Sequence, residues 1–403
     1  MNKPIKVAYV VDVLDTAQAG TENQLIKMLK GLGSRGFEIS LVSLRNHQWL
    51  VENAASLSCD VTVFQICQFK RLGTYRSILE LIRFLRAQRP DIVHTFFPVA
   101  NVVGVMAAWL AGIRNIVSSR RDYGEWMTGP YLLATRVANH FVKKIVANSP
   151  RVKTLTVLAE KVAHDKVAVI CNGLDMAAFR DVTPDHHLKQ RLGIPAGNKI
   201  VAKIANFRPM KHHDTFIRAA SVILETRGDV DFLLVGTDAA ERLLRPELEA
   251  LANSLNIAGS VHFTGQQSDV VPYLSIMDIG VNCSEGEGLS NAIMEYMAAG
   301  VPCVVSNGGG NPDLIKDGDT GRLFELYDHE QLARIVVELL DNEPERKRLS
   351  ANARKFVRDE MSIDSMLSNY EALYGALVFP QQDRRDGDDA TFCSISRQQE
   401  KKG

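Results

Sequence analysis

The sequence contains few of the residues and runs that mark specialised protein classes. Aromatic residues make up only 7% of the 403 residues, and the six cysteines are scattered without a CxxC pair. This spacing argues against the usual zinc and redox motifs, so we expect reduced thiols that mostly fill the core. The longest apolar run, 102–113, is about half of the roughly 20 residues that a membrane-spanning helix needs. It predicts a buried helix, and no signal peptide is expected.

The chain also lacks a net charge, but the two signs are unevenly distributed. Residues 1–180 contain 23 Lys and Arg against 13 Asp and Glu, a net charge of +10 that the remainder balances. A basic half predicts an anionic partner, such as a membrane surface or a phosphate-bearing acceptor. The alternative is that the two halves attract each other. Nucleic acid is disfavoured because the basic stretches lack interleaved aromatic residues. The densest basic stretch contains Lys70, Arg71, Arg76, Arg83, Arg86 and Arg89.

A length of 403 residues exceeds one ordinary core, and 46% hydrophobic with 23% charged residues is typical of a soluble globular protein. Apolar strand candidates alternate with helix candidates in two consecutive series, which start at 5–11 and at 200–205. Two such series predict an α/β protein with two doubly wound, Rossmann-like domains. The expected parts are an N-terminal domain at 1–178, a C-terminal domain at 179–363, a late helix at 364–379 and a disordered tail at 380–403.

The segment 285–302 is the most informative part of the chain. A carboxylate-rich Gly loop precedes an apolar helix that ends at Gly300 and Pro302. Glu287 and Glu295 are eight residues apart, which is about 12 Å if the whole segment is helical. They are too far apart to act as acid and base on one bond. They can hold two ends of a long ligand while the helix N-terminus faces an anion between them. A nucleotide diphosphate sugar has that layout, whereas the alternative is an amphipathic helix with a solvated acidic start.

This segment closely resembles the Glu-x7-Glu motif of the retaining glycosyltransferases of family 4. The resemblance extends from about residue 5 to about residue 375, and four further segments carry it: 19–22, 169–175, 206–214 and 308–321. It implies the GT-B fold, in which two Rossmann-like domains face a cleft and the C-terminal helix crosses back to the first domain.

Breaking a glycosyl–phosphate bond places negative charge on the departing nucleotide diphosphate, so the site must supply cations there. Lys211, on the loop after the strand 200–205, is the first candidate, and Arg208 precedes it by three residues. The arginine that the family usually has stands five residues before the lysine, where this chain has Asn206. Arg208 is therefore a shifted counterpart, and a solvated loop is the alternative for both residues.

The resemblance also implies which residues hold the donor. Glu295 accepts hydrogen bonds from both ribose hydroxyls, as a carboxylate with two acceptor oxygens can. Glu287 holds a sugar hydroxyl, whereas Glu285 lies outside the motif register and is expected to be solvated. Main-chain N–H groups complete the sugar and phosphate contacts, and on the opposite wall a glycine lets the backbone approach the phosphate. These backbone positions are Gly288, Leu289, Ser290 and Gly20.

The acceptor residues are less clearly marked. His94 ends a strand, where a histidine either contacts substrate or is structural. Many relatives have a functional histidine at the end of the next strand, but here the segment 118–123 contains none. Arg120, Arg121 and Asp122 are candidates to bind an acidic or phosphorylated acceptor in its place.

The sequence therefore predicts a hexosyltransferase-type enzyme that moves a sugar, with retention, from a nucleotide diphosphate sugar to a hydroxyl of a glycan or lipid-linked acceptor. We expect a role in cell-surface polysaccharide or glycolipid biosynthesis. The expected location is the cytoplasm, with peripheral contact to an anionic membrane as a further expectation. No DxD with companion ligands ends a strand, so we expect neither a catalytic metal nor another cofactor. The alternatives are a non-catalytic sugar-nucleotide-binding subunit and a GT-B nucleotide-sugar epimerase.

Overall fold

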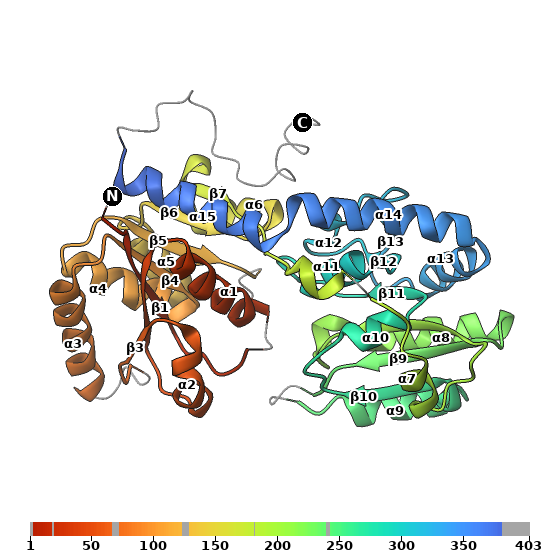
Figure 1. The fold of residues 1–403 in the computed structure, drawn as a ribbon. Helices are drawn as coiled ribbons and strands as arrows, with labels where there is room; N and C mark the ends of the chain where they lie inside the picture. Colours follow the sequence, from red (N-terminus) through yellow and green to blue (C-terminus); the bar gives the residue numbers. More distant parts are fainter. Residues whose placement is uncertain are drawn as a thin grey trace. The chain divides into compact units, whose positions relative to one another are not determined.

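The computed structural model describes residues 3–17, 20–66, 72–122, 129–180, 182–238 and 242–380 (Figure 1). The chain divides into two compact units. One comprises residues up to Gly173 together with the chain from Ile363, and the other is Leu174–Ser362. The predicted domain limits differ from these by five residues at the first join and by one at the second.

The first unit is built on a parallel sheet with the strand order β3-β2-β1-β4-β5-β6-β7. Its central strands β4 and β5 are buried along their whole length, as is typical of a parallel sheet covered on both faces. The strands are β1 (Lys6–Val11), β2 (Glu38–Ser43), β3 (Asp60–Val63), β4 (Ile92–Phe96), β5 (Ile116–Arg120), β6 (Lys144–Ala147) and β7 (Val167–Val169). The helices are α1 (Gly20–Ser34), α2 (Gln48–Asn53), α3 (Leu72–Gln88), α4 (Val105–Leu110), α5 (Pro130–Asn139), α6 (Pro150–Glu160) and α15 (Ile363–Val378), with short turns η1 (Ala54–Leu57), η2 (Ala100–Gly104) and η3 (His164–Lys166).

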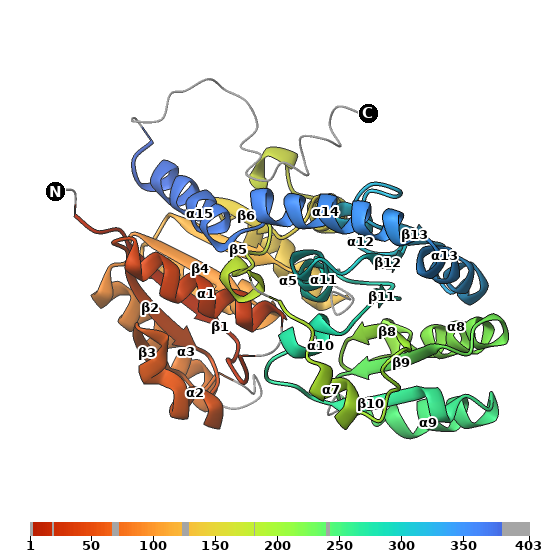
Figure 2. The same cartoon turned by 45° about the vertical axis from the view of Figure 1, so that its right-hand side comes forward.

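The last described helix, α15, returns to the first unit, as expected for the GT-B fold. It lies beside α1 in both views (Figures 1 and 2). Its buried face packs Leu367 and Tyr370 into the same core as Tyr9 of β1. On the surface, Arg35 of the first unit forms ion pairs of 2.7 Å with both Asp364 and Glu371.

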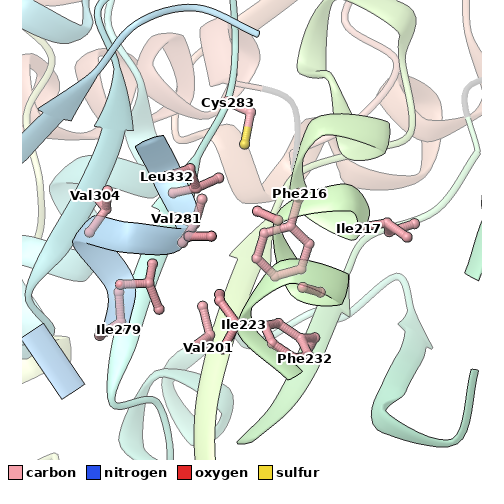
Figure 3. Packing of buried hydrophobic residues seen from close by; sticks show 14 of the residues in the cluster. Val201, Phe216, Ile217, Ile223, Phe232, Ile279, Val281, Cys283, Val304 and Leu332 are labelled. Carbon is pink, nitrogen blue, oxygen red and sulfur yellow. The ribbon is translucent and has the colours of Figure 1, made fainter. Parts of the chain in front are cut away.

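The second unit has a separate parallel sheet with the order β10-β9-β8-β11-β12-β13. Its strands are β8 (Lys199–Ile204), β9 (Val230–Val235), β10 (Val261–Gly265), β11 (Ile279–Asn282), β12 (Cys303–Ser306) and β13 (Arg322–Phe324). The helices are α7 (His186–Arg191), α8 (His213–Thr226), α9 (Arg245–Ser254), α10 (Val271–Ser275), α11 (Asn291–Ala299), α12 (Asn311–Leu314), α13 (His329–Asp341) and α14 (Glu343–Glu360), with turns η4 (Met176–Phe179), η5 (Pro209–Lys211) and η6 (Ala258–Ser260). Figure 3 shows how Phe216 of α8 and Leu332 of α13 pack with strand residues such as Val281.

The cysteines correct one expectation. Cys59, Cys283 and Cys303 are free thiols, as predicted. Cys171 is disulfide-bonded, so the prediction of reduced thiols throughout is wrong. The predicted tail beyond Pro380 lies outside the described residues, as do Lys70 and Arg71 of the basic stretch. None of the described helices combines the length and apolarity that a bilayer crossing requires.

Candidate functional site

An ion pair between Lys211 and Glu287 forms the centre of the candidate site. Lys211 lies on the loop after β8 and Glu287 on the loop after β11, and the two strands are neighbours. Because parallel strands end at the same edge of a sheet, these loops meet there. The Lys211 Nζ lies 2.8 Å from the Glu287 Oε1, and the two side chains are 18% and 15% exposed. Asn282, the last residue of β11, also donates a hydrogen bond of 3.1 Å to Glu287.

The environment keeps Glu287 ionised. Burial alone would raise the pKa of this carboxyl, but the Lys211 ammonium and the surrounding hydrogen bonds lower the pKa to about 2. The carboxylate therefore remains a hydrogen-bond acceptor throughout the physiological pH range.

We expect Glu287→Gln to remove part of the acid sensitivity of folding. The pKa of Glu287 falls from its usual 4.5 to about 2 in the folded protein, so the ionised group stabilises the fold above about pH 4.5. That contribution, of roughly 3 kcal/mol, is lost as the pH falls towards 2. Urea unfolding at several pH values should show wild type as the more stable protein at pH 7, with the difference shrinking in acid. A difference that does not change with pH would contradict this account.

The loop that carries Glu287 packs tightly against the loop after β12. Gly310 donates its N–H to the Glu287 carbonyl at 2.8 Å. A side chain at Gly310 would place a Cβ only 2.2 Å from the Gly288 carbonyl oxygen, so this close approach requires glycine. Leu289 and Ser290 are buried in the same turn. The loop backbone is thus held in one conformation at the start of α11.

Glu295 lies on α11, about one and a half turns after the loop, and its side chain is half-buried. The next residue, Tyr296, is fully buried and fastens the helix to the sheet. Its hydroxyl accepts a hydrogen bond of 2.7 Å from the Ile204 N–H at the end of β8. Its ring lies against β11, where a Cβ at Gly280 would come within 2.7 Å of the ring. Glu287 and Glu295 thus occupy a rigid loop and helix, although their ligand contacts stay a prediction.

The other two donor candidates are exposed. Arg208 lies on the loop after β8 and lines a pocket of about 240 Å³ together with residues of α9 such as Leu248. That pocket is lined by neither Lys211 nor Glu287. Gly20 is the first residue of α1 in the other unit. The structure does not test the phosphate contacts expected of Arg208 and Gly20, which stay predictions.

His94 is part of a buried network. Its Nδ1 lies 2.6 Å from the Tyr374 hydroxyl of α15, and its Nε2 lies 2.9 Å from the Ser119 hydroxyl of β5. Burial, with a smaller effect of the nearby Arg121 charge, holds the pKa of His94 well below its usual value. A neutral ring with both nitrogens engaged fixes α15 to the sheet. Of the two interpretations of His94, the structural one fits this geometry.

Arg120 also differs from its predicted role. The guanidinium is buried and forms a bidentate ion pair with Glu160, at 2.6 and 2.9 Å. The remaining donors bind the Ser118 hydroxyl, the Ser119 carbonyl and the Asn139 side chain. All five N–H donors are therefore used inside the protein, and none is left for an acceptor. We assign Arg120 a structural role.

Arg121 is in a different position. Its guanidinium donates to the Asn172 side chain and lies 6.0 Å from the centre of the Phe96 ring. Its Nε is buried and has no hydrogen-bond partner. The Tyr370 hydroxyl of α15 and the Glu22 carboxylate also interact with this guanidinium. Asp122 is exposed beside it.

Several buried charged residues were not predicted from the sequence, among them Asp12 and Lys203. Asp12, directly after β1, accepts hydrogen bonds from the Val99 and Ala100 N–H groups, and burial raises its pKa to about 6. Lys203 of β8 is 1% exposed, and its Nζ has no hydrogen-bond partner. Burial lowers the pKa of Lys203, whose charged neighbours include Lys211, Glu287 and Asp214. The sequence feature that could have indicated Lys203 is its position inside an otherwise apolar strand.

Lys203→Met should stabilise the second unit. The substitution keeps the length of the side chain and removes a buried amine that lacks a partner, so the gain should be about 1–3 kcal/mol. Urea unfolding measures it. Lys199→Met at the start of β8 is the matched control, because Lys199 forms a partly exposed ion pair of 3.1 Å with Asp278 and should change stability little. A less stable Lys203→Met protein would show that the amine has a stabilising partner.

Metal ligands do not gather in the described part of the chain. Nowhere in it do three or more His, Cys, Asp or Glu side chains come together in a way that would hold an ion.

Two family models match the sequence. The model described as "Glycosyltransferase Family 4" matches residues 19–178, and the model described as "Glycosyl transferases group 1" matches residues 185–356. Between them they cover most of both units.

Several curated proteins are similar in sequence to this chain. The chain is 32% identical over 210 residues to N-acetyl-alpha-D-glucosaminyl L-malate synthase of Bacillus anthracis, covering 52% of this chain and 53% of that relative. It thus spans about half the length of that protein. It is 25% identical to UDP-Gal:alpha-D-GlcNAc-diphosphoundecaprenol alpha-1,3-galactosyltransferase of Escherichia coli, covering 75% of this chain and 80% of the relative. It is also 25% identical to D-inositol 3-phosphate glycosyltransferase of Thermomonospora curvata, covering 89% and 92%.

Solved structures share the fold. Anabaena HepE in complex with UDP superposes with a TM-score of 0.82 at 20% identity, covering 92% of this chain and 100% of that one. The same protein in complex with UDP-glucose gives a TM-score of 0.79 at 21% identity, covering 92% and 99%.

Proposed function

The chain belongs to the glycosyltransferases of family 4, with the GT-B fold, and on that basis we propose that it transfers a sugar from a UDP-sugar to a hydroxyl group with retention. The observation that carries the proposal is the Lys211–Glu287 pair at the sheet edge, beside the N-terminus of α11. It combines a cation for a departing diphosphate with a carboxylate for sugar hydroxyls. UDP as the nucleotide is supported by the ligands of the Anabaena structures.

The roles of the donor residues follow from this arrangement. Lys211 stabilises the negative charge that develops on the diphosphate as the glycosyl bond breaks. Glu287, kept ionised by Lys211, orients the sugar through its hydroxyls. Glu295 holds the ribose at the far end of the donor. Retention would follow a front-face route in which a phosphate oxygen of the leaving group accepts the proton of the acceptor hydroxyl.

The proposed acceptor carries an anionic group. The names of three relatives specify L-malate, diphosphoundecaprenol and inositol 3-phosphate, and each of these compounds bears a carboxylate or a phosphate. In this chain, the partly exposed Arg121 is the proposed cation for such a contact. A role in glycolipid or cell-surface glycan synthesis is consistent with this acceptor chemistry.

A UDP-sugar assay tests the proposal. Purified protein should release UDP from at least one of UDP-glucose, UDP-galactose and UDP-N-acetylglucosamine, and UDP should raise its melting temperature. In a screen of phosphate- and carboxylate-bearing acceptors, Arg121→Met should raise the KM of the acceptor more than that of the donor. UDP binding without turnover would indicate a non-catalytic binding subunit, and conversion of the donor sugar into its epimer would indicate an epimerase.

We further propose that transfer needs no metal ion, because Lys211 supplies the positive charge at the leaving group. EDTA should then leave turnover intact. Loss of turnover in EDTA that Mg²⁺ or Mn²⁺ restores would contradict this part of the proposal.

Contact with an anionic membrane is a separate proposal, supported by one face of α3. Tyr75 and Leu79 are 54% and 52% exposed although apolar, and Arg83 and Arg86 are exposed on the same helix. Each well-placed basic residue contributes about 1 kcal/mol of attraction to anionic lipid, which salt screens. The protein should co-sediment with phosphatidylserine-containing vesicles at low salt but not with neutral ones, and Leu79→Ser with Arg83→Glu should abolish this. Equal binding to both vesicle types, or none, would favour a soluble acceptor.

A further inference from the structure

Three loops of the second unit meet beside the Lys211–Glu287 pair through His212, Glu285 and Tyr327, which we call the clasp. Tyr327, after β13, donates a hydrogen bond from its hydroxyl to the Glu285 carboxylate. The Nε2 of His212, after β8, lies 3.1 Å from the same carboxylate oxygen of Glu285. The His212 and Tyr327 rings are 4.7 Å apart and almost perpendicular, at 81°. Glu285, expected to be solvated, is 36% exposed but hydrogen-bonded to Tyr327, and the nearby His212 Nε2 makes no hydrogen bond to the described residues.

The clasp residues adjoin the residues of the proposed chemistry. His212 directly follows Lys211, and Glu285 precedes Glu287 by two residues. The Glu285 N–H also donates to the Met210 carbonyl at 3.1 Å, so backbone and side chains link the same two loops. Asp214 lies 3.8 Å from the other ring nitrogen of His212.

Two clasp residues adopt a strained backbone. His212 has a φ of 46° and Tyr327 a φ of 71°, in the left-handed region that residues other than glycine rarely occupy. Glycine would adopt either conformation freely, but it would lack the rings and the hydroxyl that form the clasp. Strain of this kind persists where the surroundings fix it, and it gathers at functional sites. The contacts of the two side chains therefore explain why His212 and Tyr327, rather than glycines, occupy these left-handed positions.

We propose that the clasp holds the loops of Lys211 and Glu287 in register and thereby positions the ion pair for transfer. Its residues are positioning residues that act through the pair. The effect on rate rests on the proposed function, whereas the effect on the loop does not. A misplacement of about 1 Å at reacting groups can lower a rate about 100-fold, so a small loosening of either loop is enough to matter.

Three substitutions test the contact between Tyr327 and Glu285: Tyr327→Phe, Glu285→Gln and the two combined. Each single variant should lower kcat for hydrolysis of the UDP-sugar that wild type turns over fastest by about tenfold, with KM changing less than about threefold. The double variant should lose no more kcat than the less active of the two single variants, because both substitutions break the same contact. Hydrogen exchange of the amides 284–290 should accelerate in every variant, while distant amides stay protected.

Tyr327→Gly tests whether Tyr327 acts by positioning the loops or by stabilising the fold. Relief of the left-handed backbone offsets the lost ring contacts, so the melting temperature should stay within about 2–4 °C of wild type while kcat falls at least as far as in Tyr327→Phe. Lys161→Gly is the matched control, because Lys161 has a φ of 56° at the C-cap of α6 in the other unit. It should relieve the same strain and leave kcat unchanged.

The outcomes separate the two proposals. Unchanged exchange of the amides 284–290, or losses in kcat that add in the double variant, would overturn the clasp. Faster exchange of these amides in a protein whose wild type hydrolyses no UDP-sugar would support the clasp as a link between the loops and overturn the proposed function instead.

Discussion

Lys211→Ala should lower kcat by about 100- to 1,000-fold while nucleotide binding falls much less. Negative charge builds on the diphosphate as the glycosyl bond breaks, so the ammonium contributes most in the transition state. The loss of one such electrostatic stabiliser corresponds to about 3 kcal/mol. Steady-state kinetics with the preferred UDP-sugar, combined with calorimetric UDP affinity, separates the two effects.

The first control concerns Glu287, which Lys211→Ala leaves without its ion-pair partner. Without Lys211, Glu287 remains in a largely buried site without its closest countercharge, because the 2.8 Å ion pair is gone. Lys211→Ala combined with Glu287→Gln should therefore recover stability but not turnover. Lys199→Ala removes a lysine from the opposite end of β8 and should leave kcat unchanged. If Lys211→Ala raises KM and leaves kcat level, Lys211 binds the donor without assisting the departure of the diphosphate.

Glu295→Ala should weaken UDP binding by about 10- to 100-fold. Hydrogen bonds to a charged group contribute roughly 1.5–3 kcal/mol, and this carboxylate is expected to accept two from the ribose. Isothermal titration with UDP measures the change, and deoxyuridine diphosphate provides a second probe because it lacks one hydroxyl. Wild type should discriminate against the deoxy compound, and Glu295→Ala should not.

A helical carboxylate outside the site provides the control for that experiment. Glu338 of α13 is 53% exposed and lies 3.7 Å from Arg322, so Glu338→Ala should bind UDP like wild type. A folded Glu295→Ala protein with wild-type affinity would remove the ribose assignment.

The sequence by itself determined the class of fold and grouped Lys211 and Glu287 in one candidate site. Alternation of apolar strands with helices is a local pattern, so two doubly wound units could be predicted before any contact was known. Lys211 and Glu287 could be predicted to belong to one site because each follows a buried parallel strand within a recognisable motif. The structure brings them to 2.8 Å.

Only the tertiary structure decided what the neighbouring residues do. Arg120 and Arg121 are adjacent in sequence, but successive side chains of an extended segment point to opposite sides. One meets Glu160, which lies 40 residues further along the chain, and the other meets Asn172. The local sequence has no feature that indicates which arginine finds a buried carboxylate and which keeps an unpartnered nitrogen.

The same reason applies to His94, Lys203 and Glu285. One partner of His94 is Tyr374, 280 residues away, and the hydroxyl that donates to Glu285 belongs to Tyr327, 42 residues away. Lys203 occupies an apolar strand, yet nothing in its local sequence shows that its amine has no partner. The hydrophobic periodicity of a helix or strand depends on residues that are close together in the chain, so it can be recognised from the sequence alone. The role of a buried polar group depends on which distant segments pack around it, because burial and pairing together fix its charge and its hydrogen bonds.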